Sequence, residues 1–131
     1  MVYKMTFEEL KEKVLEWADD KDLLHEENAD KQFMKFIEEV FEFKSEFDYL
    51  CRIGKDPSEV YSDYEQIETQ ENMELEMGDI FVTLIILCED LEIDPVVCLE
   101  MAYEKISKRT GKTINGNFYK QEDLEGMEWQ K

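Results

Sequence analysis

Glycine and proline are scarce in this chain, which has five glycines and two prolines among 131 residues. A chain with so few of them has few places to turn sharply, and its apolar residues recur at helical rather than alternating spacing. These features predict one domain over residues 1–131. We expect it to be all-α and four-helix-bundle-like, with a short irregular C-terminal tail.

Basic residues are also scarce. The chain has 15 Lys and Arg but 34 Asp and Glu, which gives a formal net charge of −19. So much negative charge repels nucleic-acid phosphates and anionic lipid, and therefore disfavours sequence-independent binding to either. A cationic partner, often a metal ion, is favoured instead. The longest apolar stretch, Ile80 to Cys88, is less than half a membrane span, so we expect no membrane insertion.

Cysteine is limited to three residues, Cys51, Cys88 and Cys98, which show no CxxC spacing and sit inside apolar runs. An odd number of cysteines without such spacing predicts buried free thiols in a reducing compartment. The first residues also lack the apolar segment of a signal peptide. We therefore expect a cytoplasmic protein.

Four helices are expected from the apolar spacing and from capping residues. Thr6, with Glu9 three residues later, fits a capping box at the start of the first helix. The segment 55–69 has no strong apolar period and reads as a loop or short helix. The predicted helices cover residues 6–19, 28–53, 70–91 and 95–110, and the apolar face of the last one is formed by Leu99, Ala102, Tyr103 and Ile106.

Two groups of carboxylates lie among apolar residues, where solvated acids are not expected. Glu38, Glu39 and Glu42 fall within a 100° arc of the second helix, because each residue advances the helix by about 100°. Glu76 and Asp79 are three residues apart in the third helix, directly before its apolar run. If the two helices pack together, the Glu39/Glu42 pair faces the Glu76/Asp79 pair.

Such a cluster must be neutralised, because two like charges at 4 Å cost about 4 kcal/mol at an effective dielectric of 20. Either several of the acids are protonated or a divalent cation lies between them. Oxygen-only ligands favour Mg²⁺ first and Mn²⁺ second, and the lone His25 is in no Glu-x-x-His motif of a di-iron site. On spacing alone, a metal site and two ordinary salt-bridged acidic faces remain open alternatives.

The two acidic motifs also resemble those of a known family. Glu38 to Glu42 reads as EExxE and Glu76 to Asp79 as ExxD, and further similarity lies in ENADKQFMKFIEEVFEF and KISKRTGKTINGNFYKQEDL. Together these segments resemble the MazG-like branch of the all-α nucleotide pyrophosphohydrolases over most of the chain. The resemblance implies Mg²⁺-dependent hydrolysis of a nucleoside triphosphate between its α and β phosphates, giving the monophosphate and pyrophosphate.

Carried over residue by residue, the resemblance places the Mg²⁺ ligands at Glu39, Glu42, Glu76 and Asp79. Glu38 and Glu39 are then the expected catalytic residues. Glu38 would orient or deprotonate the attacking water, or hold a ligand or a lysine in place. The 33 residues between Glu42 and Glu76 are more than the family usually has, which leaves substrate specificity more open than catalysis.

Substrate contacts are expected from five further residues, each with a plain structural alternative. Trp17 would stack on a base or pack in the core. Lys108, Arg109 and Lys112 would meet phosphates, or would only stabilise the end of a helix. Asn115 would meet phosphate or sugar, or would support a turn.

The small size of the unit and its many aromatic residues predict a homo-oligomer, a dimer or tetramer. Members of the family commonly complete their active sites across subunits, so Trp17 or the tail would be donated in this way. Two other classes of function stay open. One is a non-catalytic acidic helical module that binds a basic protein, and the other is a related helical dUTPase, dCTPase or phosphoribosyl-ATP pyrophosphohydrolase.

Overall fold

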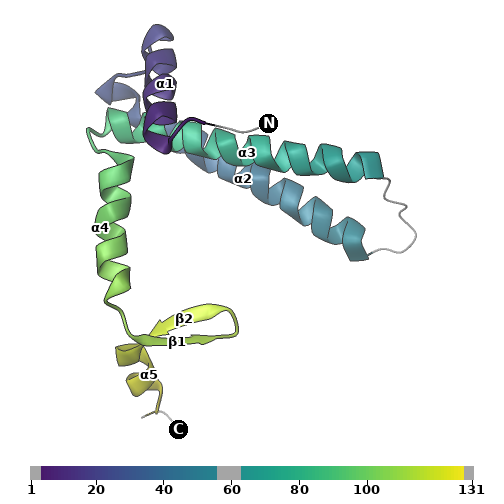
Figure 1. Cartoon of the computed structure of the whole chain (residues 1–131), viewed down its shortest axis with the longest axis vertical. Helices are drawn as coiled ribbons and strands as arrows, with labels where there is room; N and C mark the ends of the chain where they lie inside the picture. Colours follow the sequence, from purple (N-terminus) through teal and green to yellow (C-terminus); the bar gives the residue numbers. More distant parts are fainter. Residues whose placement is uncertain (1–3, 56–62, 129–131) are drawn as a thin grey trace. The chain divides into compact units, whose positions relative to one another are not determined.

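The computed structural model describes residues 4–55 and 63–128, and these are predominantly helical, which confirms the all-α expectation (Figure 1). The chain divides into two compact units, residues 1–95 and 96–131, and each is described by itself. The first unit contains α1 (Phe7–Asp20), a 3-10 helix (Glu26–Asn28), α2 (Ala29–Lys55) and α3 (Asp63–Asp90). The second contains α4 (Pro95–Ser107) apart from its first residue, together with β1 (Gly111–Ile114), β2 (Asn117–Lys120) and α5 (Gln121–Glu128).

Helix α1 begins where the capping residues predict. Thr6 is the N-cap in an extended conformation, and its Oγ1 accepts a hydrogen bond from the Glu9 backbone N–H at 3.2 Å. This bond satisfies one of the N–H groups that the first helical turn leaves without a partner. The helix ends at Asp20, and Asp22 follows in the left-handed conformation with φ of 58°.

Helices α2 and α3 lie side by side and form the long helical pair of the first unit (Figure 1). Both are longer than expected, because α2 continues through Gly54 to Lys55 and α3 already begins at Asp63. The prediction of a loop or short helix over 55–69 is therefore wrong for residues 63–69, which carry good helix formers and no Gly or Pro. Residues 56–62 of that segment lie outside the described residues.

The core of the first unit lies where α1 crosses the C-terminal half of α3. Phe7 of α1 contacts Phe81 of α3 edge to face, with ring centroids 6.2 Å apart. Burial is uneven along the apolar run 80–88, because Phe81 near its start is 45% exposed whereas residues 85–88 are all buried. The buried apolar residues are Ala18, Ile85, Ile86, Leu87 and Cys88.

Helix α4 begins at Pro95 as expected and ends at Ser107, three residues before the predicted end. Its predicted apolar face is exposed, because nothing in the described part of the chain covers Leu99, Ala102, Tyr103 or Ile106. Cys51, Cys88 and Cys98 form no disulfide with one another, as their spacing predicts. Only Cys88 is buried, however, and Cys51 and Cys98 are exposed.

The tail was expected to be irregular, and this expectation is wrong. Strands β1 and β2 form an antiparallel hairpin in which Gly111 pairs with Lys120 and Ile114 with Asn117, and α5 follows directly. Asn115 and Gly116 make the turn with φ of 50° and 81°, the two left-handed residues that a tight hairpin turn requires. Over the described ranges, no helix has both the length and the apolar content to cross a membrane.

Candidate metal centre and adjoining pocket

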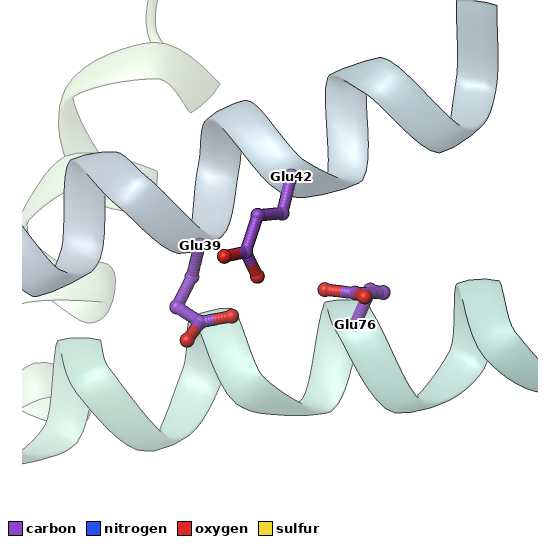
Figure 2. A group of neighbouring side chains, drawn as sticks. All are labelled: Glu39, Glu42 and Glu76. Carbon is purple, nitrogen blue, oxygen red and sulfur yellow. The ribbon is translucent and has the colours of Figure 1, made fainter. Parts of the chain in front are cut away.

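Three glutamates from two helices converge in the first unit. Glu39, Glu42 and Glu76 each offer a carboxylate oxygen, and these oxygens lie within 4.8 Å of one another. Figure 2 shows Glu39 and Glu42 reaching from α2 toward α3, and Glu76 reaching from α3 toward them. The convergence follows from the sequence, because residues three apart share one face of a helix and α2 packs along α3.

The cluster is electrostatically strained. Burial raises the pKa of Glu39, which is 8% exposed, and the charges of Glu42 and Asp79 raise it further. Burial also raises the pKa of Glu76, as do the charges of Glu39, Asp79 and Glu46. Glu76 Oε2 is buried and accepts no hydrogen bond from the described residues. Glu76 therefore lacks a positive partner among the described residues, whereas Glu39 has Lys35 at 3.6 Å, which offsets only part of the rise in its pKa.

A hard divalent cation fits this donor set. All three donors are carboxylate oxygens, the ligands that Mg²⁺ and Mn²⁺ prefer, and no cysteine or histidine joins them among the described residues. A cation would also pair with the buried oxygen of Glu76 and offset the repulsion. The residues present are therefore suited to Mg²⁺.

Asp79, the fourth predicted ligand, is not part of the three-residue group. Its side chain is exposed, yet its charge acts on Glu39 and Glu76 and raises the pKa of both. Asp79 and Glu39 also line the same pocket. The structure therefore brings three of the four predicted ligands together and leaves the fourth beside them.

Glu38 lies outside the cluster and is paired with a lysine. Lys35 Nζ is 3.6 Å from a carboxylate oxygen of Glu38 and 3.6 Å from one of Glu39. The Glu38 side chain is 62% exposed, and it lines a separate hollow of about 380 Å³ that also reaches Glu42. Of the roles predicted for Glu38, the structure shows the pairing with a lysine.

A pocket of about 480 Å³ adjoins the cluster. Trp17 forms part of its wall and is 51% exposed, so its ring is not packed in the core. Besides Trp17, the lining is apolar at Leu23, Val82 and Ile86, basic at Lys31 and Lys35, polar at Gln32 and Thr83, and acidic at Glu39 and Asp79. The pocket thus combines an apolar, aromatic wall with two of the predicted carboxylates.

The predicted phosphate contacts lie in the second unit. Lys108 and Arg109 line a pocket of about 330 Å³ together with Lys105 and Lys120. None of these four cations forms an ion pair with a described residue. Lys112 does not line this pocket.

Two predicted contact residues belong to the hairpin instead. Lys112 lies on β1, where it is paired with Tyr119 of β2. Asn115 occupies the left-handed turn, which agrees with its structural alternative.

Sequence reasoning missed two residues next to these acids. Gln32 lines the pocket, and Glu46 raises the pKa of Glu76. The signal was present, because Gln32 is seven residues before Glu39 and Glu46 is four residues after Glu42, spacings that place each pair on one helix face.

Comparisons of the chain with protein-family models, curated proteins and solved structures find no match.

Proposed function

We propose that the protein is a Mg²⁺-dependent nucleoside triphosphate pyrophosphohydrolase similar to the MazG-like branch of the all-α family. It would hydrolyse a (d)NTP between the α and β phosphates to a (d)NMP and pyrophosphate. The observation that carries the proposal is the group of Glu39, Glu42 and Glu76, whose carboxylate oxygens converge within 4.8 Å, with Glu39 buried, Glu76 half-buried and Glu42 exposed. Raised pKa values at Glu39 and Glu76 support it, because perturbed carboxyls gather at functional sites.

Glu39, Glu42 and Glu76 would hold the metal, with Asp79 beside them. Bound there, Mg²⁺ would supply positive charge to the phosphate oxygens and lower the pKa of a water molecule. The chain itself carries a net charge of −19, so these carboxylates would repel a polyphosphate in the absence of a cation. The cluster is therefore suited to a phosphate substrate only in its metal-bound form.

Glu38 is the carboxylate of the EExxE motif that stays outside the cluster. Its exposed side chain is available to accept a proton from the attacking water, and its contact with Lys35 would hold it beside Glu39. The water oxygen would attack the α phosphorus, the bond from that phosphorus to the α–β bridging oxygen would break, and pyrophosphate would leave.

We also propose that the protein is a homo-oligomer. Large apolar side chains are exposed on three helices, with Phe41 71%, Leu75 68%, Leu99 71% and Met101 67% exposed. Soluble monomers rarely expose extended apolar surface of this kind. Light scattering should therefore give a particle larger than 15.7 kDa, and a particle of that mass would contradict the proposal.

Incubation with individual NTPs and dNTPs in the presence of Mg²⁺ tests the activity. The products should be the monophosphate and pyrophosphate, and Glu39→Gln should abolish their formation. Glu16→Gln is the matched control, because Glu16 is an exposed acid of α1 outside the cluster and the pocket. Release of orthophosphate, or full activity of the Glu39 variant, would overturn the mechanism.

The same panel, extended by phosphoribosyl-ATP, separates the remaining alternatives. A dUTPase or dCTPase would turn over one nucleotide only, and a phosphoribosyl-ATP pyrophosphohydrolase would turn over none of the common nucleotides but would act on phosphoribosyl-ATP. If none of these substrates is turned over, the non-catalytic acidic module is favoured. The 34 acidic residues of the chain would suit binding to a basic protein.

A further inference from the structure

The pocket beside the carboxylates has the composition of a site for a flat, partly polar ring. Its volume of about 480 Å³ falls in the range of roughly 300–1,000 Å³ typical of small-molecule sites. Val82 and Ile86 give it an apolar floor, and the half-exposed ring of Trp17 stands at its wall. Aromatic rings of this kind stack on any of the nucleobases, because every base has a flat π-face.

The pocket shares one carboxylate with the proposed metal centre. Glu39 lines the pocket and is also a member of the three-carboxylate group, and Asp79 lines the pocket beside it. A nucleotide whose phosphates lie at the carboxylates therefore has this pocket available for its base.

Gln32 is the neutral amide among the pocket residues. It is half-buried on α2, two helical turns before Glu39, and its side chain forms no hydrogen bond with the described residues. An amide offers two donors and one acceptor, and so can pair with the hydrogen-bonding edge of a base. A few polar groups placed in an otherwise apolar pocket usually determine the orientation and identity of the ligand.

We propose that this pocket binds the nucleobase of the substrate, that Trp17 stacks on the base, and that Gln32 reads its hydrogen-bonding edge. The inference rests on the proposed function and adds the residue that sets base preference. It assigns Gln32 to specificity rather than to the bond-breaking step.

Two substitutions at position 32 test this assignment. Gln32→Glu leaves only acceptors, so it should favour the base with two adjacent donors, which is guanine with its N1–H and N2 amine. We expect kcat/KM for dGTP relative to dATP, dCTP and dTTP to rise at least tenfold. Gln32→Leu removes the polar group at similar size, and the differences among the four nucleotides should shrink at least tenfold.

Gln70→Glu is the matched control, because it makes the same chemical change on α3 outside the pocket, where Gln70 pairs with Glu74. Its base ratios should equal those of the wild type. Ratios that stay constant in both Gln32 variants, while the wild type releases pyrophosphate, would overturn the inference and leave the proposed function intact.

A binding measurement decides the inference without turnover. Calorimetric titration with the four deoxynucleoside monophosphates and Mg²⁺ should show at least tenfold weaker binding by Trp17→Ala, and a changed order of affinities in Gln32→Glu. Trp17 is half exposed, so its truncation should leave the fold intact, which circular dichroism checks. If the wild type hydrolyses no nucleotide, the proposed function fails, and unchanged affinities in this titration would then overturn the base pocket as well.

Discussion

Glu39 on α2 and Glu76 on α3 hold carboxylate oxygens within 4.8 Å of each other across the helix pair (Figure 2). At about 5 Å and an effective dielectric of about 20, two such charges repel by roughly 3 kcal/mol. Burial adds to this cost and raises the pKa of both carboxyls. The repulsion between these two carboxylates therefore lowers the stability of the fold, and a bound cation would relieve it.

Replacing Glu76 with Gln should stabilise the protein in the absence of Mg²⁺ and remove its response to the ion. The substitution deletes one charge of the cluster, so we expect a melting temperature several degrees higher at neutral pH without metal. Wild-type protein should gain about 2.7 kcal/mol at a Mg²⁺ concentration about 100 times Kd, and Glu76→Gln much less. Thermal melts with Mg²⁺ and with EDTA measure both effects.

The matched control for this experiment is Glu16→Gln, which removes one exposed acid of α1. It should keep the wild-type response to Mg²⁺. A Glu76 variant that melts below the wild type without metal, or that still responds fully to Mg²⁺, would show that these carboxylates do not form a cation site.

Lys35 should compete with the metal for the same carboxylates. Its Nζ lies 3.6 Å from Glu38 and 3.6 Å from Glu39, and it is the nearest positive charge to the cluster that the described residues show. Lys35→Ala should therefore raise the apparent affinity for Mg²⁺ several-fold and lower the melting temperature without metal. A Mg²⁺ titration followed by thermal melts gives the affinity.

Lys44→Ala provides the comparison, because Lys44 pairs with Asp48 at 2.8 Å on the same helix but outside the cluster. It should leave the apparent Mg²⁺ affinity unchanged. Equal effects of the two substitutions would mean that general charge, and not the local pair, governs the affinity.

Helical spacing was sufficient to predict much of the cluster. Glu39 and Glu42 share a face because they are three residues apart, and the apolar run after Glu76 indicated that α3 packs against α2. Spacing did not place Asp79, because a 60° offset along a helix does not tell whether a side chain reaches across to the neighbour or toward solvent. In the structure it is exposed.

Periodicity also shows which face of a helix is apolar without showing what covers it. Leu99 and Ile106 define such a face on α4, and both are exposed.

The hairpin was missed for a different reason. The Asn115–Gly116 pair is a strong turn signal, but strands of four residues are too short to show alternation among helical segments.

Asp90 should make stability depend on pH. It is 3% exposed near the end of α3, and burial raises its pKa, an effect that His25 partly opposes. By strict geometry neither carboxylate oxygen accepts a hydrogen bond from the described residues, so the nearby His25 backbone N–H offsets only part of the cost of burial. An acid whose pKa is raised on folding stabilises the native state below its unfolded pKa, and this stability is lost as pH rises through the folded pKa.

Asp90→Asn removes this titration and should raise the free energy of unfolding by about 1 kcal/mol at neutral pH. The difference from wild type should vanish below about pH 4, where the wild-type group is protonated in both states. Denaturant unfolding of both proteins between about pH 4 and neutral pH measures this difference in the free energy of unfolding. Glu89→Gln, a neighbouring exposed acid, should show no such pH-dependent gain, and a constant difference for Asp90→Asn would contradict the prediction.

Asn115 should tolerate glycine but not alanine if its role is the turn. Its φ of 50° is strained for alanine by about 1 kcal/mol and unstrained for glycine. Asn115→Gly should therefore keep hydrolysis within about twofold of the wild type, and Asn115→Ala should destabilise the hairpin. Loss of activity in a stably folded glycine variant would instead show that the amide contacts the substrate.

The two lysines predicted to meet phosphate should separate in a kinetic test. Lys108 lines the pocket that also holds Lys105, Arg109 and Lys120. Glu122 is the one acid in this lining, and none of the four cations forms an ion pair with a described residue. An oligophosphate would relieve their mutual repulsion. Lys112 is on the hairpin and outside this pocket.

Lys108→Ala should therefore raise KM for the nucleotide and weaken inhibition by pyrophosphate, each by at least about tenfold, a loss of roughly 1.4 kcal/mol of binding. Lys112→Ala removes the same charge four residues later and should change both by less than about twofold. Steady-state kinetics at several pyrophosphate concentrations give both constants. If Lys112→Ala were as damaging as Lys108→Ala, the contacts to the phosphates would not be confined to the pocket that Lys108 lines.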